Sequence, residues 1–495
     1  MTTETREPWL SLSEICEYLS VSDDTLYRFI KHRGFPAQKV GNRWKAQKSK
    51  IDAWIRQKNE TPLFMTDTQD LVPQHAKNIA TPPEQFRVLS LFSGCGGLDL
   101  GFLGGFSSMG KQYTRNNTRI VFANDIDEDA EKCYNSNILL TQNGDRCTLG
   151  DIRAIPYNDL PNFDIMLAGF PCQPFSNAGN RKGVNDDNGR GTLFEVCEQV
   201  LKSKIENLPE EQQPIAFVFE NVRGIMSSKM PNGTTVPEEI KKRMDAMGYN
   251  VSMQLICASN YGVPQARYRC LIIGIKKKVK LVSGKTVTTT PFDFKEMEDI
   301  IRKNDIPSVA NGTYSKLLIG SILQDLPQGE PECEYWEYSK TTQDMVEKIG
   351  PCIHGMDTLK LFSGNFDLAK LPQAVFEGRS WKNIDPKFLT PRFRKIYDNP
   401  KRYHAPKFFR RFAFGEINGT ITASAQPENC GITHPVENRR YTVREIARIQ
   451  SFPDSFSFGA IPLQSRYKVI GNAVPPVLGW VIANALIAHL EKEIK

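Results

Sequence analysis

The chain has 495 residues, a net charge of +7, and hydrophobic and charged fractions of 40% and 24%. These values are ordinary for a soluble globular protein, and the length predicts more than one domain. No apolar run reaches the length of a membrane span and the first residues lack a signal-peptide pattern, so we expect a cytoplasmic protein with no membrane partner. Eleven cysteines without a Cys-x-x-Cys pair, together with six scattered histidines, indicate neither a disulfide framework nor a metal site.

Residues 1–58 are predicted to form a small separate module. Ser11 or Ser13 can cap a first helix, and two further helices are expected at 24–31 and 48–58. A Gly-Asn pair between the second and third helices favours a hairpin turn. The module therefore has the order helix, helix, hairpin, helix.

This order resembles the winged helix-turn-helix modules of excisionases. The resemblance implies that the second helix enters a DNA major groove, with contacts from Arg28, Lys31 and Arg43. The alternative is a helical protein-interaction domain with a solvated basic face. Residues 59–84, with four prolines and no sustained period, predict a linker to the rest of the chain.

Two apolar strands with polar ends follow the linker. Residues 87–91 run into a glycine-rich turn and helix at 92–102, the arrangement in which a backbone can approach a nucleotide cofactor. The strand at 119–123 leads to Asp125, whose carboxylate could accept hydrogen bonds from both hydroxyls of a ribose. Asp151 comes next along the chain, in the segment Gly150-Asp151-Ile152, although for each aspartate alone a helix N-cap is the simpler interpretation.

A cysteine between two prolines is the strongest chemical signal in the sequence. The apolar run 165–168 predicts a buried parallel strand, and Pro171 and Pro174 exclude helix or strand after it. Cys172 is therefore expected on a stiff loop at the carboxyl end of a strand, where open α/β sheets bind their ligands. A buried, inert cysteine is the alternative, but it would need no proline on either side.

Charged residues accompany two further strands. Glu220 leaves the apolar strand 215–219 and is a candidate general acid, although an exposed loop glutamate is the commoner case. Arg267 and Arg269 precede the strand 270–275. At positions i and i+2 of a strand they would share one face and make it strongly cationic.

The pattern changes after the last of these strands. Residues 276–430 have a weak apolar pattern, and the mixture of basic and aromatic residues at 392–411 favours a nucleic-acid partner over a solvated insertion. A capping box of Thr442 and Glu445 opens an amphipathic helix, for which a structural role is the better interpretation. Residues 467–476 place a Gly-Asn turn and paired prolines ahead of a long apolar helix.

The segment Gly-Phe-Pro-Cys-Gln-Pro-Phe-Ser at 169–176 resembles the catalytic loop of the DNA (cytosine-5) methyltransferases. The other blocks of that family occur in the family's order between Phe86 and Leu490. The resemblance implies an α/β fold in which a Rossmann-like, S-adenosylmethionine-dependent methyltransferase sheet carries a smaller target-recognition domain, with the winged helix-turn-helix in front. The implied parts are a catalytic domain at 85–278, a target-recognition region at 279–430 and a C-terminal return to the catalytic domain at 431–495.

The resemblance also implies roles for single residues. Cys172 would add to carbon 6 of cytosine, and Glu220 would act as the acid at ring nitrogen 3. Arg267 and Arg269 would bind the ring carbonyl oxygen and favour the thiolate. Cofactor contacts are implied for Phe92, Gly94, Gly96, Leu98, Asp125, Ile126, Asp151, Ile152, Gly169, Pro171, Asn472 and Val474. Substrate contacts are implied for Phe170, through its carbonyl, and for Gln173, Ser176, Gln265 and Thr420.

These features predict a DNA (cytosine-5-)-methyltransferase of the prokaryotic restriction–modification type. It would transfer a methyl group from S-adenosylmethionine to carbon 5 of a flipped cytosine in a specific double-stranded DNA sequence. The alternatives are a tRNA cytosine-5 methyltransferase and a DNA-binding regulator with a dormant methyltransferase body. We expect a cytoplasmic, nucleoid-associated monomer, with a cognate restriction endonuclease that acts on the same DNA sequence as a further candidate partner.

Overall fold

The computed structural model describes most of the catalytic region and parts of the N-terminal module. The described residues are 9–19, 26, 35–40, 43–51, 64–65, 85–139, 146–170, 193–230, 233–326, 333–352, 356–399 and 409–494. Apart from Leu26, the predicted helix at 24–31 lies outside them, and so do Cys172 and the two prolines beside it.

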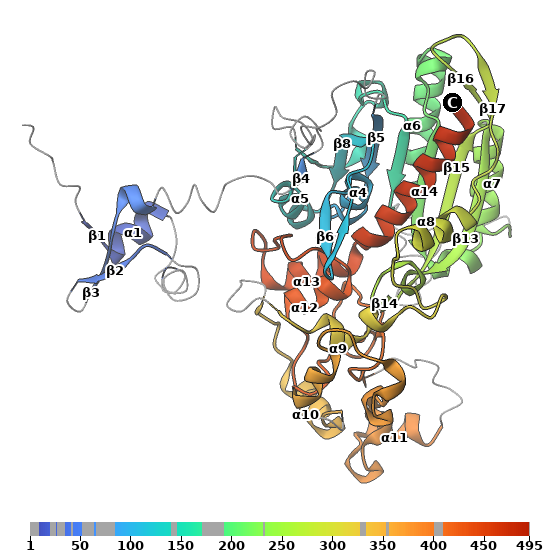
Figure 1. Cartoon of the computed structure of the whole chain (residues 1–495). Helices are drawn as coiled ribbons and strands as arrows, with labels where there is room; N and C mark the ends of the chain where they lie inside the picture. Colours follow the sequence, from blue (N-terminus) through green and yellow to red (C-terminus); the bar gives the residue numbers. More distant parts are fainter. Residues whose placement is uncertain are drawn as a thin grey trace, which may run out of the picture.

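A seven-stranded sheet forms the centre of the catalytic region (Figure 1). Its order is β10-β8-β5-β11-β12-β15-β13. The bounds are β5 Phe86–Leu91, β8 Thr118–Asp125, β10 Thr148–Leu149, β11 Ile165–Ala168, β12 Ala216–Val222, β13 Tyr249–Cys257 and β15 Tyr268–Lys276. The strands from β10 to β12 are parallel, whereas β15 lies antiparallel between β12 and β13. The predicted α/β fold is confirmed, and each predicted strand matches an observed one to within three residues.

Both faces of the sheet are buried by helices. Ile165 and Leu167 of β11 belong to an apolar core shared with α4 and α14, whereas Met166 and Ala168 belong to one shared with α6 and α7. Burial on both faces explains why the strands are continuous apolar runs in the sequence. The helices are α4 Gly97–Leu103, α5 Glu128–Asn135, α6 Leu193–Asn207, α7 Val236–Ala246, α8 Lys295–Lys303, α9 Ile319–Ile322, α10 Lys340–Ile349, α11 Pro391–Tyr397, α12 Val443–Ile449, α13 Leu463–Asn472 and α14 Pro476–Ile494.

The end of the chain returns to pack on α4, the first helix of the catalytic region (Figure 1). A Cβ on Gly101 of α4 would lie 2.6 Å from the Cα of Gly479 of α14, so the two helices approach at a distance that only glycine permits. By length and composition the stretch Leu463–Ile494 could cross a membrane, but 83% of its most apolar window is buried inside the fold. This burial is the property of a core element.

A further, smaller core is formed by residues that lie between β17 (Thr286–Thr288) and α12 in the sequence. Figure 1 shows α10 and α11 of this region in orange, at the opposite end of the catalytic region from the C-terminus of the chain. The core consists of Met345, Ile349, Trp381, Ile384, Phe393 and Phe409. The expected smaller domain is therefore present.

Short strand pairs complete the catalytic region. They are β4 Phe64–Met65 with β9 Ile138–Leu139, β6 Phe106–Ser108 with β7 Lys111–Tyr113, β14 Gln265–Ala266 with β20 Asn418–Gly419, β16 Lys278–Lys280 with β17 Thr286–Thr288, and β18 Arg379–Ser380 with β19 Arg410–Arg411. Two residues of the predicted linker thus pair with a strand of the catalytic region.

The N-terminal module has a core of its own. Its described elements are β1 Trp9–Ser11, α1 Leu12–Leu19, β2 Gln38–Val40 and β3 Arg43–Gln47, with the sheet order β1-β3-β2. Of the two predicted caps, Ser11 is used: its hydroxyl oxygen accepts a hydrogen bond from the Glu14 N–H at 3.5 Å, and the Glu14 carboxylate accepts one from the Ser11 N–H at 2.7 Å. The predicted hairpin is confirmed by β2 and β3, whereas β1 is a strand that the sequence did not indicate. Ile15, Leu26, Phe35, Ala46 and Ile51 fill the core.

Candidate active site

The glycine-rich turn after β5 has a backbone shape that few side chains permit. Phe92, Gly94 and Gly96 have positive φ values of 55°, 57° and 87°. Nothing lies within 4 Å of the place where a Cβ on Gly94 would be, so the backbone there faces open space. A Cβ on Gly96, in contrast, would lie 2.6 Å from the Ile138 side chain. The turn therefore offers bare backbone on one side and is tightly packed on the other.

Asp125 ends β8 beside this turn. Its Oδ2 accepts a hydrogen bond from the Gly94 N–H at 2.7 Å, and its Oδ1 accepts one from the Asp127 N–H at 2.9 Å. Burial raises the pKa of Asp125, and these N–H donors partly offset the shift. Each carboxylate oxygen keeps a lone pair for a hydroxyl group. The neighbouring Ile126 side chain is 66% exposed, which leaves an apolar surface for a flat ring.

Asp151 is engaged by its own neighbours. It caps the short 3-10 helix η1 (Ile152–Ala154), and its Oδ2 lies 2.6 Å from Nη2 of Arg153. The hydrogen bonds from Arg153 lower the pKa of Asp151. The side chain of Ile152 is buried in the core of the sheet, so only its backbone can face a ligand. The cap that the sequence favoured for an isolated aspartate is observed here, and an adenine contact of Asp151 stays a prediction.

Glu220 of β12 and Arg269 of β15 form a nearly buried ion pair. Arg269 Nε lies 2.6 Å from Glu220 Oε1, and the two side chains are 11% and 10% exposed. Burial lowers the pKa of Arg269, and the Glu220 carboxylate opposes that shift. A Cβ on Gly169, just after β11, would lie 3.9 Å from Glu220 Oε2 and 3.9 Å from the carbonyl oxygen of Phe92. The ends of β5, β11 and β12 therefore meet at one place, at the edge where such sheets bind ligands.

Arg267 does not share the surroundings of Arg269. It lies between β14 and β15 and is fully buried, and burial lowers its pKa well below the usual value. Its guanidinium donates to three backbone carbonyls at 2.9–3.2 Å, those of Ile421, Gly471 and Ala473. The expected common face required a continuous strand, but the strand is interrupted at residue 267. Arg267 instead ties this block to the smaller domain and to the last turn of α13.

Gln265 and Thr420, both predicted to contact DNA, also bind protein groups. Gln265 is buried, accepts a hydrogen bond from the Ile421 N–H at 3.1 Å and donates to Gln450 Oε1 at 2.5 Å. The Thr420 hydroxyl donates to the Ala266 carbonyl at 2.9 Å. These bonds flank the parallel pair β14–β20, which joins the catalytic sheet to the smaller domain. A DNA contact of Gln265 would require its present hydrogen bonds to break.

Phe170 is the last described residue before the predicted catalytic loop. Its ring packs edge-on against Phe219 at 5.7 Å, and its carbonyl accepts a hydrogen bond from Asn221 Nδ2 at 3.4 Å. A carbonyl oxygen has two lone pairs, so one remains for the predicted contact with an exocyclic amine. The predicted site residues outside the described part of the chain are Pro171, Cys172, Gln173, Ser176, Arg28 and Lys31, and the side chain of Arg43 is likewise not described.

The last block adds an ion pair that the sequence did not point to. Lys468 of α13 pairs with Asp127, which caps α5. Burial alone would raise the pKa of Asp127, but the pKa is lowered because Lys468 and the helix N–H groups stabilise the carboxylate. The two residues are 341 positions apart, so no local spacing could reveal the pair. Of the predicted cofactor residues here, Asn472 is exposed and Val474 is buried, as is Leu98 of α4.

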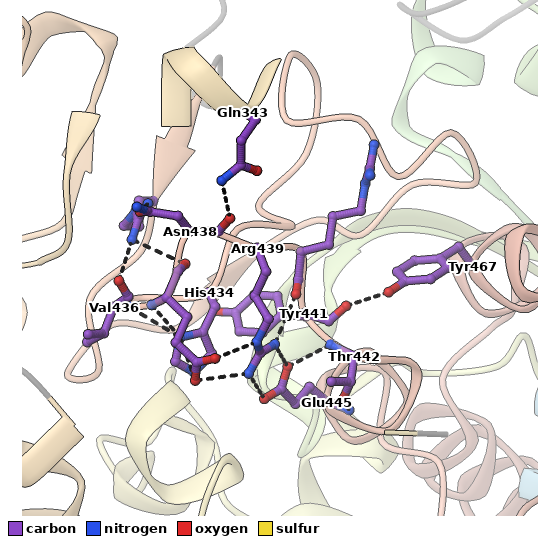
Figure 2. A network of polar contacts seen from close by, with 12 residues as sticks. Gln343, His434, Val436, Asn438, Arg439, Tyr441, Thr442, Glu445 and Tyr467 are labelled. Atoms are coloured by element: carbon purple, nitrogen blue, oxygen red, sulfur yellow. Dashed lines mark hydrogen bonds and ion pairs between the residues drawn. The ribbon is translucent and has the colours of Figure 1, made fainter. Parts of the chain in front are cut away.

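A polar network attaches the smaller domain to α12 and α13 (Figure 2). Arg439 Nη1 donates to Glu445 Oε2 at 2.7 Å. The Tyr467 hydroxyl donates to the backbone carbonyl of Tyr441 at 2.5 Å. His434 is buried, and its Nδ1 accepts from the Glu437 N–H at 3.0 Å. Burial lowers the pKa of His434 to about 3, so its ring stays neutral. Gln343 Nε2 of α10 donates to the Asn438 carbonyl at 3.0 Å, so the network joins the smaller domain to the segment that leads into α12.

Arg411 corrects the interpretation of the basic stretch at 392–411. It is fully buried, and it donates to the Val436 carbonyl at 3.0 Å and to Asn438 Oδ1 at 2.7 Å. The expectation that this stretch faces nucleic acid is therefore wrong for Arg411. Five N–H donors allow a buried guanidinium to satisfy several loop carbonyls at once.

The fold and the converging strand ends define an α/β enzyme that binds a nucleotide-like cofactor at one edge of its sheet. The family model of the C-5 cytosine-specific DNA methylases matches residues 86–488, and that of a helix-turn-helix domain matches residues 9–59. The Type II methyltransferase M.NgoPII of Neisseria gonorrhoeae is 31% identical over 417 residues, covering 82% of this chain and 96% of that protein. The Type II methyltransferase M.Eco47II of Escherichia coli is 28% identical over 504 residues, covering 97% and 96%. The solved structure of the Entamoeba histolytica methyltransferase EhMeth has a TM-score of 0.47 and 16% identity, covering 83% and 99%.

The chain belongs to the C-5 cytosine-specific DNA methylase family. It is a DNA (cytosine-5) methyltransferase, with S-adenosylmethionine as its methyl donor and DNA as its substrate.

Proposed function

We propose that the enzyme acts through a covalent Cys172 adduct with a cytosine that has been flipped out of duplex DNA. Carbon 5 of cytosine is a poor nucleophile. Addition of the Cys172 thiolate to carbon 6 turns the ring into an enamine, and carbon 5 can then take a methyl group. Transfer of the carbon 5 proton to a base lets the carbon–sulfur bond break and frees Cys172. The base must leave the stack because neighbouring bases cover its ring faces there.

The Glu220–Arg269 ion pair is the observation that carries this proposal. It lies beside Gly169, which comes three residues before Cys172. We assign Glu220 to the proton at ring nitrogen 3 and Arg269 to the neighbouring carbonyl oxygen. Nearly buried groups in fixed positions stabilise developing charge without rearrangement of solvent. The guanidinium of Arg267 donates its hydrogen bonds to backbone carbonyls, so we do not propose a direct contact with the base. Its proposed contribution is the positive charge that it adds near Arg269 and Glu220.

The residues around the glycine turn fit S-adenosylmethionine, which supplies an electrophilic methyl group when bound. Open space beside Gly94 leaves room for a ligand against the backbone. We propose that Asp125 binds the ribose hydroxyls through its free lone pairs and that Ile126 packs on the adenine. The other proposed contacts are those of Phe92, Gly96, Leu98, Asp151, Ile152, Gly169, Pro171, Asn472 and Val474.

We further propose that the N-terminal module makes a second DNA contact through Arg28, Lys31 and Arg43. The match to a helix-turn-helix model supports it. Deletion of residues 1–80 should weaken DNA binding and reduce its salt dependence, because fewer phosphates are neutralised. The methylated sequence should stay the same, and a changed sequence would contradict this assignment.

The names of the relatives support a place in a restriction–modification system, since they are called Type II methyltransferases. In that setting a cognate endonuclease would act on the same DNA sequence. We propose that the enzyme acts there as a cytoplasmic monomer on the nucleoid. Sedimentation of the enzyme on its own and with a duplex would test the monomer.

Transfer of labelled methyl groups to duplex DNA, to tRNA and to no acceptor tests the substrate class. We expect label in DNA alone. Label in tRNA alone would favour the tRNA methyltransferase alternative, and no transfer to either would favour the dormant regulator. Bisulfite sequencing of a methylation-free host that expresses the enzyme would then give the recognised DNA sequence.

A further inference from the structure

A patch of exposed side chains lies directly beyond the Glu220–Arg269 pair. Val222 and Arg269 form the last residue pair of the β12–β15 ladder, so Arg223 leaves β12 where Tyr268 begins β15. The Arg223 guanidinium lies 5.6 Å from the centre of the Tyr268 ring. Arg223 is itself exposed, and the Tyr268 side chain is 45% exposed.

The patch lies on the other face of β15 from the proposed catalytic pair. Successive strand residues point to opposite faces, so Tyr268 points away from the side on which Arg269 meets Glu220. Cys270 follows on the same face as Tyr268 and is buried in the core shared with α6 and α7. Its Sγ lies 3.4 Å from the sulfur of Met226, which is 40% exposed. The two faces of one strand end therefore carry a nearly buried ion pair and an exposed patch.

The charge of Arg223 distinguishes this patch from an ordinary surface. Some exposed arginines elsewhere pair with carboxylates, as Arg302 does with Asp299 and Arg394 with Asp398. In the described part of the chain Arg223 has no carboxylate within 4 Å, and the Tyr268 ring is its partner. A single exposed apolar residue needs no explanation, but an exposed ring, a methionine and an uncompensated cation side by side fit an interaction surface.

We propose that Arg223 and Tyr268 bind the DNA backbone beside the flipped cytosine, with Met226 against the adjoining sugar. The proposal rests on the assignment of Glu220 and Arg269 to the target base, because that assignment places the duplex at this strand end. A phosphate supplies the negative charge that the protein does not provide for Arg223. Contact with the Tyr268 ring restricts the guanidinium and leaves its N–H groups available for phosphate oxygens.

The variant Arg223→Ala tests the contact. The KM for duplex DNA should rise about tenfold, and the slope of log Kd for DNA against log salt should fall by about 1, the change expected for one lost phosphate contact. Turnover at saturating DNA, S-adenosylmethionine affinity and melting temperature should be unchanged. Arg223→Lys should keep the salt slope but raise KM, because an ammonium keeps the charge and loses the fixed orientation. Tyr268→Phe should behave as wild type, whereas Tyr268→Ala should raise KM without changing the salt slope.

Arg119→Ala is the matched control. Arg119 is an exposed arginine near the start of β8, at the other end of the parallel strands, and its loss should leave KM and the salt slope unchanged. The proposal is overturned if Arg223→Ala matches Arg119→Ala, or if it lowers S-adenosylmethionine affinity or melting temperature. If Glu220→Gln retains full turnover while Arg223→Ala still weakens DNA binding, the catalytic assignment fails and the DNA contact stands.

Discussion

The two halves of the sheet's carboxyl edge are built from different groups. At the cofactor edge, formed by the ends of β5 and β8, backbone geometry dominates, since positive φ angles expose the glycine turn and N–H groups hold Asp125. At the proposed base edge, formed by the end of β12 and the start of β15, two charged side chains face each other with little exposure. A cofactor is recognised by shape and hydrogen bonds, whereas a reacting ring needs charges in fixed positions.

This difference assigns a different kinetic effect to each edge. Substitutions at the cofactor edge should change affinity for S-adenosylmethionine, because the groups there are proposed to contact the donor both before and during the reaction. Substitutions at the base edge should change turnover, because a nearly buried ion pair is costly to assemble and contributes where charge develops. The predictions below test this division, starting with the largest effect.

Glu220→Gln should lower turnover without changing the affinity for S-adenosylmethionine. Loss of the proposed proton donor should lower turnover by roughly 10²- to 10⁴-fold, the usual contribution of a general acid. S-adenosylmethionine affinity, measured by calorimetry, should be nearly unchanged. Glu238→Gln is a control, because Glu238 serves in the exposed capping box of α7. If the variant lost as much cofactor affinity as turnover, the assignment of separate kinetic effects to the two edges would be contradicted.

Asp125→Ala should weaken the binding of S-adenosylmethionine without lowering turnover at saturating cofactor. Removal of a charged hydrogen-bond acceptor should weaken S-adenosylmethionine binding by about 1–3 kcal/mol, while turnover at saturating cofactor is retained. Asp151→Ala should cost less, because the Asp151 carboxylate is already paired with Arg153. Calorimetry in which Asp151→Ala costs more than Asp125→Ala would mean that the roles of the two aspartates have been exchanged.

Asp99, which lies in α4 after the glycine turn of the cofactor edge, should make the free energy of unfolding depend on pH. This fully buried residue of α4 accepts hydrogen bonds from Ser90 Oγ at 2.7 Å and from the Tyr134 hydroxyl at 2.8 Å, and burial raises its pKa to about 6. Below that pH the folded protein binds a proton that the unfolded chain does not. The free energy of unfolding should therefore rise as the pH falls from 7 to 5, by about 1 kcal/mol from this group.

Denaturant unfolding of wild type and Asp99→Asn at the two pH values isolates this contribution. The variant should lack the gain at low pH, because its amide does not titrate. Identical pH dependence in both proteins would show that Asp99 does not take up the proton.

Local patterns predicted the parts of the molecule that are held by local interactions. The run 165–168 became β11 without a shift, and Thr442 with Glu445 forms the predicted capping box. The burial of Arg267 and Arg411 could not be predicted, because their partners are backbone carbonyls that the tertiary fold brings to them. An arginine in a basic stretch has the same sequence signal whether it faces solvent or loop carbonyls.

The covalent Cys172 adduct is the central claim, and a mechanism-based trap tests it most directly. Duplex DNA that carries 5-fluorocytosine, incubated with the enzyme and S-adenosylmethionine, lacks the carbon 5 proton whose loss would release the enzyme. We predict a stable protein–DNA complex in which peptide mapping finds the modification on Cys172, and no complex with Cys172→Ala, which should still bind the cofactor. An adduct on another cysteine, or methyl transfer to ordinary DNA without any trapped complex, would contradict the account.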